Sequence, residues 1–432
     1  MNQQTARGRR LPLYGWLTSE AVSLTGTRVS MIAIPWFVLT TTGSATQTGL
    51  VAFAEMAPLV ALKALAGPLV DRVGARRVAI TADVGSGIAV GLVPVLYASG
   101  VLGFPLLLAL VALAGALRGP GDGAKQAMVP TLVDHGAVPM ERATGLHSAV
   151  ERTASMAGAV IAGTLVALVG PPNALLVDAG TFLLSAVILA LSTRSLSVSS
   201  DSAPSDAEDE VGRYGQRLRE GWDFLRRDPL LLGIAVMVAV TNLFDMAYAA
   251  VLVPVWAKET GGGAASVGLI FAVFSGASIA GSVLAATWGS RLPRYRTYLV
   301  AFLLCGAPRF VVLAIDAPLW VVLATAVVGG AAAGFINPVL GAVIFERIPP
   351  RLVGRVSSLT TALCWSLIPL GGLTGGLLVG GFGLSPALMV CGVGYLIATM
   401  LPALQRRWRE MDRRPDPASL VEPAAQSRPA RR

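Results

Sequence analysis

Three carboxylic acids, Asp245, Glu20 and Glu55, lie inside long apolar stretches of this chain. A charged side chain is costly in hydrocarbon unless it is paired or hydrated, so each of them is a functional candidate. Loss of water favours the neutral form of a carboxyl group, which lets it bind and release a proton near neutral pH. We therefore predict these three as proton-coupling residues. Asp245 comes first because it lies near the middle of its stretch, and a structural hydrogen bond is the alternative for Glu55.

Basic residues in the same stretches need partners. Arg28 can pair with Asp245 or bind an anionic group of a ligand, and a purely structural ion pair is an equally good interpretation. Arg118 and Asp122 are four residues apart, the spacing of neighbours on one helix face, which favours a local ion pair. Other candidates for the wall of an adaptable apolar cavity, with packing as the alternative, are Asn242, Asn337, Phe244, Trp36 and Trp365.

The composition shows which elements hold these residues. Of 432 residues, 54% are hydrophobic and only 14% are charged, a balance typical of a polytopic membrane protein. Apolar segments of about 18 to 25 residues, enough to cross a bilayer core of about 30 Å as a helix, recur about twelve times. The predicted spans are 13–40, 47–70, 77–99, 103–124, 146–169, 173–192, 230–257, 264–288, 298–315, 318–345, 356–380 and 385–404.

The net charge of +9 is unevenly distributed. Basic residues precede the first span and fill alternate loops, Lys125 among them, whereas the remaining loops hold only Lys258. By the positive-inside rule, both termini and the long middle loop are cytoplasmic, and this pattern argues against nucleic acid as a partner. The scarcity of lysine suggests a GC-rich bacterial genome. We expect a monomeric, multi-pass protein of the bacterial cytoplasmic membrane in contact with its lipids.

A polar stretch after the sixth predicted span divides the chain. We predict a first six-helix half (1–194), a cytoplasmic linker (195–229), a second six-helix half (230–404) and a basic tail without fixed structure (405–432). A shift of 219 positions aligns Pro35 with Pro254, Gly49 with Gly268 and Arg72 with Arg291. The fold class is therefore an all-α membrane protein of twelve transmembrane helices in two pseudo-symmetric halves, with a site at their interface.

The linker contains apolar residues at helical spacing among arginines. These are Val211, Tyr214, Leu218, Trp222 and Leu225. This pattern is typical of an amphipathic helix on an anionic membrane surface.

A short charged segment, Gly67 to Arg77, separates the second and third spans and must lie at a membrane surface. It resembles the loop between helices 2 and 3 of the major facilitator superfamily, at Gly67, Asp71, Arg72, Gly74, Arg76 and Arg77. The stretches AIPWFVL near Pro35, AKQAMVPTLV from Ala124, EGWDFLRRDPLL from Glu220, LVPVWA from Leu252 and ERIPPRLVGRVSSL from Glu346 are similar to its drug:proton antiporter branch.

The resemblance implies a gate. Asp71 is expected to cap the N-terminus of helix 11 near Val356, where the helix dipole favours a carboxylate. Arg76 is expected to reach Asp122, so that the halves are latched in the outward-open state. A solvated surface loop is the alternative.

The resemblance also implies a central cavity lined by helices 1, 4, 7 and 10. Asp83, Asp178 and Arg309 fall on peripheral helices of that fold, where we expect packing roles. Relatives often carry an acid in helix 1 at the position of Gly26, so this chain departs from their pattern there.

The function implied is proton-coupled export of small lipophilic or cationic compounds, such as drugs and antibiotics, by alternating access. An exporter of one metabolite, such as a siderophore or lysophospholipid, is the alternative, and a sensor that moves nothing is a third. The sequence has no phosphate-binding Gly-Lys motif and no metal-spaced His or Cys cluster. We therefore expect neither an enzyme nor a metal or cofactor, with the proton gradient as the energy source.

Overall fold

The computed structural model describes residues 3–196 and 219–412. Within these residues the elements are helical and no strand is present. Twelve helical spans are long and apolar enough to cross a membrane. The predicted all-α class with twelve spans is therefore confirmed.

The first half contains six spans. They are α1 (Gln3–Thr42), α2 (Ala45–Ala64), α4 (Ala75–Ala98), α5 (Phe104–Ala127), α7 (Met140–Val169) and α8 (Pro171–Ser192), and the short helices α3 (Ala66–Val73) and α6 (Val129–Gly136) follow α2 and α5. The second half contains six more, three of them interrupted. They are α10 (Pro229–Ala247) with the π-helical turn η1 (Tyr248–Leu252) and α11 (Val253–Glu259), α12 (Gly263–Trp288), α13 (Arg294–Cys305) with α14 (Ala307–Ala314), α15 (Leu319–Arg347), α16 (Val353–Trp365) with α17 (Ile368–Phe382), and α18 (Leu384–Met400). Short 3₁₀ turns are η2 (Gly289–Arg291), η3 (Pro350–Leu352), η4 (Pro402–Leu404) and η5 (Arg406–Asp412).

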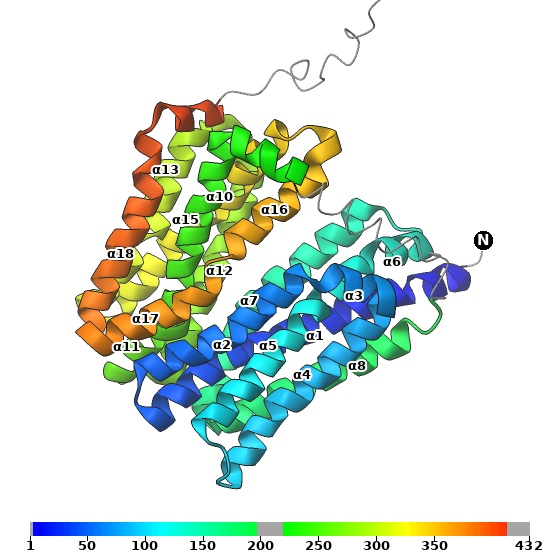
Figure 1. The fold of residues 1–432 in the computed structure, drawn as a ribbon, viewed down its shortest axis with the longest axis horizontal. Helices are drawn as coiled ribbons and strands as arrows, with labels where there is room; N and C mark the ends of the chain where they lie inside the picture. Colours follow the sequence, from blue (N-terminus) through cyan, green and yellow to red (C-terminus); the bar gives the residue numbers. More distant parts are fainter. Residues whose placement is uncertain (1–2, 197–218, 413–432) are drawn as a thin grey trace, which may run out of the picture.

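The two halves converge at one end and diverge at the other (Figure 1). They meet where α2 lies beside α17, and they separate toward α3 and α16. We call the diverging end, which holds α3, α6, the start of α16 and η5, the basic end, because it is the end predicted to face the cytoplasm. The opposite end, where α1 turns into α2, is the far end.

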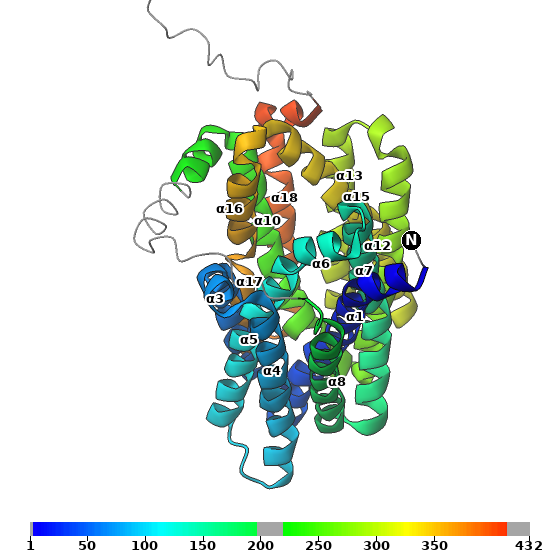
Figure 2. The same ribbon diagram turned by 90° about the vertical axis from the view of Figure 1, so that its right-hand side faces the viewer.

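Two seams join the halves, α2 against α17 and α7 against α12. They lie on opposite sides of the bundle (Figure 2). A Cβ atom on Gly49 would lie 2.2 Å from the carbonyl oxygen of Gly372, and one on Gly163 would lie 2.7 Å from Cα of Gly268. Small residues let helix backbones approach closely. Since Gly49 and Gly268 are related by the shift of 219 positions, the sequence repeat corresponds to a repeated contact.

The segment Gly67 to Arg77 differs from the predicted turn. Most of it forms the helix α3, and only Gly74 breaks the chain before α4, with a φ of 91° that favours glycine. At the basic end, Gly67, Asp71 and Arg72 thus lie in the short helix α3, and Arg76 and Arg77 lie in the first turn of α4 after Gly74.

The linker has the predicted helix where it is described, and the tail is more ordered than expected where it is described. A helix over 219–227 buries Leu225 against Ile348 and Val356 of the second half, so it contacts protein and does not only lie on the membrane surface. In the tail, η5 buries Trp408 and Met411. The rest of these segments, 197–218 and 413–432, lies outside the described residues, as do Val211, Tyr214 and Leu218.

The seam geometry predicts a stability effect. Gly49→Ala places a methyl group against the backbone of α17, and overpacking of this kind costs about 1–3 kcal/mol. We expect a lower thermal unfolding midpoint in detergent. Gly67→Ala is the matched control, because no atom lies within 4 Å of its Cβ position. Equal midpoints for both variants would contradict the tight seam.

Candidate functional site

Two helix irregularities border one space in the second half. The seventh span widens into the π-helical turn η1 directly after α10, and the ninth span is broken at Gly306 between α13 and α14. Turns of π-helix within longer helices frequently occur at functional sites. Discontinuous helices at membrane depth are tolerated where they line a cavity or are buried in protein.

The space between these elements is a cavity of about 270 Å³ lined from α10, η1, α12, α13, α14 and α15. Its walls are largely apolar, with Ile270, Phe271 and Phe274 from α12 and Val322 from α15. Asp245 and Arg309 are the charged residues of the lining. An apolar pocket with a few convergent polar groups is the usual form of a small-molecule site.

Asp245 and Arg309 form an ion pair on the wall of this cavity. The Arg309 guanidinium also lies over the rings of Tyr248, Phe310 and Tyr395, with its Cζ atom 4.8, 4.9 and 5.1 Å from the ring centroids. Such faces attract cations. The Asp245 side chain is 41% exposed, against 14% for Arg309. The carboxylate is thus the accessible member of the pair.

This pairing replaces the one that the sequence suggested. Arg28 donates to the Ser155 hydroxyl at 2.7 Å and lies near the Met31 sulfur at 3.3 Å, both in the first half. The Arg28–Asp245 prediction is therefore wrong in this structure, as is the packing role expected for Arg309. Arg309 follows a proline inside an apolar stretch. A single charge in such a stretch needs a partner, and this was the signal in the sequence that could have indicated the pair.

The position of Gly26, which aligns with Asp245, is occupied by a neighbouring carboxylate. A Cβ atom on Gly26 would lie 1.8 Å from Oγ1 of Thr181 and 2.3 Å from Oδ1 of Asp178. Asp178 is fully buried and accepts hydrogen bonds from Ser30 and Thr181. The first half therefore has its acid on α8 beside helix 1, and glycine is needed to make room for it.

Glu55 and Arg118 are also paired, across α2 and α5, with 3.0 Å between Oε1 and Nη1. Both side chains are mostly buried. The local Arg118–Asp122 pair predicted from their spacing is not the one formed. Arg118 pairs with Glu55 and not with Asp122, because the α2–α5 contact removes Glu55 from water and leaves its charge in need of a cation.

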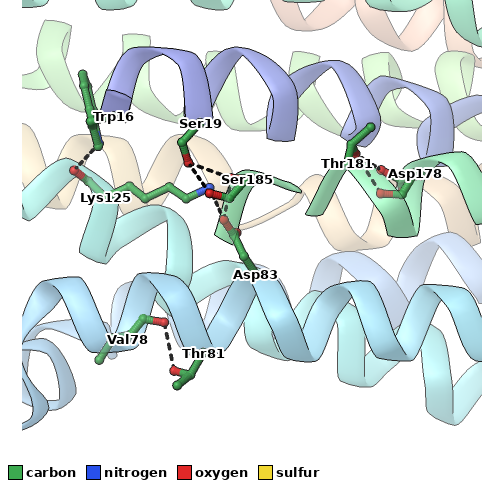
Figure 3. A network of polar contacts seen from close by, with 9 residues as sticks. All are labelled: Trp16, Ser19, Val78, Thr81, Asp83, Lys125, Asp178, Thr181 and Ser185. Atoms are coloured by element: carbon green, nitrogen blue, oxygen red, sulfur yellow. Dashed lines mark hydrogen bonds and ion pairs between the residues drawn. The ribbon is translucent and has the colours of Figure 1, made fainter. Parts of the chain in front are cut away.

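A buried polar network links four helices of the first half (Figure 3). Lys125 of α5 pairs with Asp83 of α4 at 3.0 Å, and Ser185 of α8 donates to the same carboxylate at 2.7 Å. Ser19 of α1 lies 2.7 Å from the Ser185 hydroxyl. Lys125 was predicted in a surface loop, but its side chain is 1% exposed. It is an internal counterion and not part of the basic surface.

Glu20, the next residue of α1 after Ser19, is 7% exposed. It lies within electrostatic reach of Lys125 and of three other acids, Asp83, Asp122 and Glu151. Lys125 is already bonded to Asp83. The cluster therefore holds more carboxyl groups than cations, which suits a group that binds a proton.

The remaining cavity candidates do not converge on one site. Asn242 donates to the carbonyl oxygen of Cys364 at 2.9 Å. Phe244 packs against Gly394 of α18, where a Cβ atom would lie 2.5 Å from its ring, and Trp36 packs on the core. Asn337 is exposed on α15. Trp365 lies under the ammonium group of Lys63.

The expected gate contacts are not formed in this conformation. Arg76 donates to the Thr193 hydroxyl and the Ala190 carbonyl oxygen, each at 2.8 Å, and not to Asp122. Asp71 is exposed, and α16 begins without a side-chain cap. Both observations accord with the divergence of the halves at the basic end.

Two six-helix halves joined along glycine seams, with charged pairs and a cavity among the spans, are typical of a membrane transport protein. The model of the Major Facilitator Superfamily matches residues 17–247 and 235–430. The chain belongs to this superfamily.

Several known transporters are similar in sequence to this chain. The multidrug efflux pump Tap of Mycobacterium tuberculosis is 31% identical over 94% of this chain and 96% of its own length, and Tap of Mycolicibacterium fortuitum is 27% identical over 94% and 98%. The staphyloferrin A transporter of Staphylococcus aureus is 26% identical over 41% of this chain and 44% of its own.

Solved structures show the same fold. A point mutant of the nucleoside transporter NupG has a TM-score of 0.71 at 11% identity, over 91% of this chain and 100% of that one. A bacterial homologue of human Spinster, solved inward-facing and unoccupied, has a TM-score of 0.68 at 15% identity, over 95% and 99%.

The buried Lys125–Asp83 pair predicts a large stability effect. Lys125→Met leaves the Asp83 carboxylate without its cation, and breaking a buried pair in this way costs about 3–5 kcal/mol. We expect a clear fall in the thermal unfolding midpoint. The double variant Lys125→Met/Asp83→Asn removes both charges and should recover most of the loss. A single variant as stable as the double variant would rule out the pair as a determinant of stability.

Proposed function

We propose that this protein exports small amphipathic compounds, lipophilic or cationic drugs among them, from the bacterial cytoplasm in exchange for protons. The observation that carries the proposal is the accessible Asp245 carboxylate, paired with Arg309 on the wall of an apolar cavity. Similarity to the Tap multidrug efflux pumps over nearly the whole chain supports drugs as the substrate class.

The proposed proton site is Asp245. A proton on this carboxylate removes its attraction to Arg309. The three aromatic rings around the guanidinium then stabilise the positive charge of Arg309 without the carboxylate. Because Asp245 lies on α10 and Arg309 on α14, the proton alters a contact between two helices that border the cavity. A ligand or proton shifts a conformational equilibrium only through such differential contacts. Glu20 and Glu55 are the further candidates, with Lys125 and Arg118 as their nearest cations.

The orientation in the membrane is part of the proposal. With the basic end and both termini in the cytoplasm, the halves meet on the outer side and diverge inward. This conformation is then inward-facing, as is the solved structure of the Spinster homologue with the same fold. Alternating access follows if the halves rock about the two seams, with the proton gradient as the energy source and no cofactor.

Export of a single metabolite is the second candidate function. The partial similarity to the staphyloferrin A transporter favours a siderophore in that case. Proteoliposomes with an imposed pH gradient and a mixed pool of drugs and siderophores separate the two, because a dedicated exporter would move one compound and leave the drugs behind.

The proton site gives a first test. Asp245→Asn keeps the shape of the side chain but cannot release a proton, so export in proteoliposomes should no longer respond to an imposed pH gradient. Asp316→Asn is the control, since Asp316 lies in a far-end turn with a φ of 50° that asparagine also tolerates. Full pH-driven export by Asp245→Asn would exclude this carboxylate as the coupling group.

The gate gives a second test. We propose that Asp71 caps α16 when the basic end closes, so Asp71→Asn should lower the population of that closed state about twofold to fivefold, the worth of a charge at a helix N-terminus. Double electron–electron resonance between spin labels on α3 and α16 gives distance distributions that report this population. The exposed Asp134 of α6 provides the control Asp134→Asn at the same end. Unchanged distance distributions would show that Asp71 makes no latch.

A further inference from the structure

Lys63 and Trp365 make a contact between the two halves. Lys63 lies one residue before the end of α2, and Trp365 is the last residue of α16, where the chain breaks before α17. The Lys63 ammonium nitrogen lies 4.6 Å from the centroid of the Trp365 ring. Both side chains are half-buried. The contact belongs to the α2–α17 seam at its end toward the basic side.

This ammonium group has a neutral partner. Glu55, the acid on the same helix, is paired with Arg118, and among the described residues no carboxylate forms an ion pair with Lys63. Its position is therefore held by the face of an aromatic ring, which attracts cations through its quadrupole. Such a contact is weaker than a buried ion pair and is open to exchange.

The other seam has a corresponding contact with different chemistry. Arg152 of α7 donates to the hydroxyl of Ser282 on α12 at 3.0 Å. Ser282 aligns with Lys63 under the shift of 219 positions. Lys63 lies about 27 Å from the far end of α2, and Arg152 about 26 Å from the far end of α7. Each seam thus has, at a similar depth, a cation of the first half on a neutral side chain of the second. Of these two contacts, Lys63–Trp365 has an aromatic face and Arg152–Ser282 has a hydroxyl.

We propose that the Trp365 ring is the binding face for the cationic group of a lipophilic substrate, and that Lys63 occupies this face until the substrate displaces it. The proposal rests on the proposed function and specifies the substrates of that exporter as organic monovalent cations. Lys63 then determines specificity, because it excludes cations that bind the ring less well than its own ammonium group does.

The exchange has a physical direction. A lysine ammonium is strongly hydrated and sits on a flexible stem, so Lys63 gains water when it leaves the ring and extends toward the diverging basic end. A lipophilic cation is weakly hydrated and loses little when it enters. The displaced contact joins the two halves, so binding of the substrate removes a link across the seam and thereby acts on the equilibrium between conformations.

The test compares two hydrophobic ions of the same shape and opposite charge, tetraphenylphosphonium and tetraphenylborate. Binding to the purified full-length chain is measured by equilibrium dialysis in detergent, with empty micelles as the blank. Lys63→Met should tighten binding of tetraphenylphosphonium by about threefold to thirtyfold, the range of a cation–π contact. Binding of tetraphenylborate should weaken or stay unchanged.

Two further variants make the test specific. Arg152→Met removes the cation of the other seam and should change the affinity for tetraphenylphosphonium less than twofold. Trp365→Leu should weaken binding of this cation, and Lys63→Met should have no further effect in that background, because the two residues act on one site. Unfolding midpoints show which variants are folded, and Trp365→Phe, which keeps an aromatic face, should retain part of the affinity.

Several outcomes would overturn the proposal. They are an equal response of both ions to Lys63→Met, an equal response to Arg152→Met, or an additive effect of Lys63→Met and Trp365→Leu. Export of tetraphenylphosphonium driven by a pH gradient, with no response of its binding to Lys63→Met, would refute this proposal and leave the proposed function intact. Failure of the wild-type chain to bind the cation at all would count against both.

Discussion

The cost of an isolated charge away from water governs the arrangement of this protein, because each charged side chain within a span must find a partner on another helix. The pairs Glu55–Arg118, Lys125–Asp83 and Asp245–Arg309 meet this need, and each joins two helices of the same half. At the basic end, Arg294–Glu346 also stays within the second half, and Arg347 pairs with Asp228, the residue that caps α10. These ion pairs therefore hold each half together as a body, and none of them ties one half to the other.

The contacts between the halves are of another kind. Glycines at positions 49, 163, 268 and 372 bring backbones together, and the polar contacts that cross the seams involve neutral partners, as in Lys63–Trp365, Arg152–Ser282 and the bond from Lys258 to the Leu39 carbonyl oxygen. Such contacts are short in reach and individually weak. Two internally paired bodies that meet along small-residue seams are suited to rocking, since movement at a seam leaves the ion pairs Glu55–Arg118, Lys125–Asp83 and Asp245–Arg309 intact.

The two halves share a plan but not a chemistry. In the first half, the space among α1, α2, α4 and α5 is almost filled, with about 10 Å³ left beside Glu55 and Arg118. In the second half, the corresponding space among α10, α12, α14 and α15 remains open at about 270 Å³ and holds the Asp245–Arg309 pair. The π-helical turn at Tyr248 and the break at Gly306 belong to the open half alone. Functional asymmetry thus arises from local departures within a repeated fold.

The amino-acid sequence by itself determined the membrane class, the twelve spans, the two-half repeat and the glycine pair at 49 and 268, because length, apolar composition and spacing are properties of neighbouring residues. It also marked Asp245, Glu20 and Glu55 as exceptional. Only the tertiary structure decided that Asp245 pairs with Arg309 and not Arg28, that Arg118 pairs with Glu55 and not Asp122, and that Lys125 is buried. The physical reason is that a buried charge pairs with whatever helix packing brings within reach, and that packing depends on contacts between segments far apart in the chain.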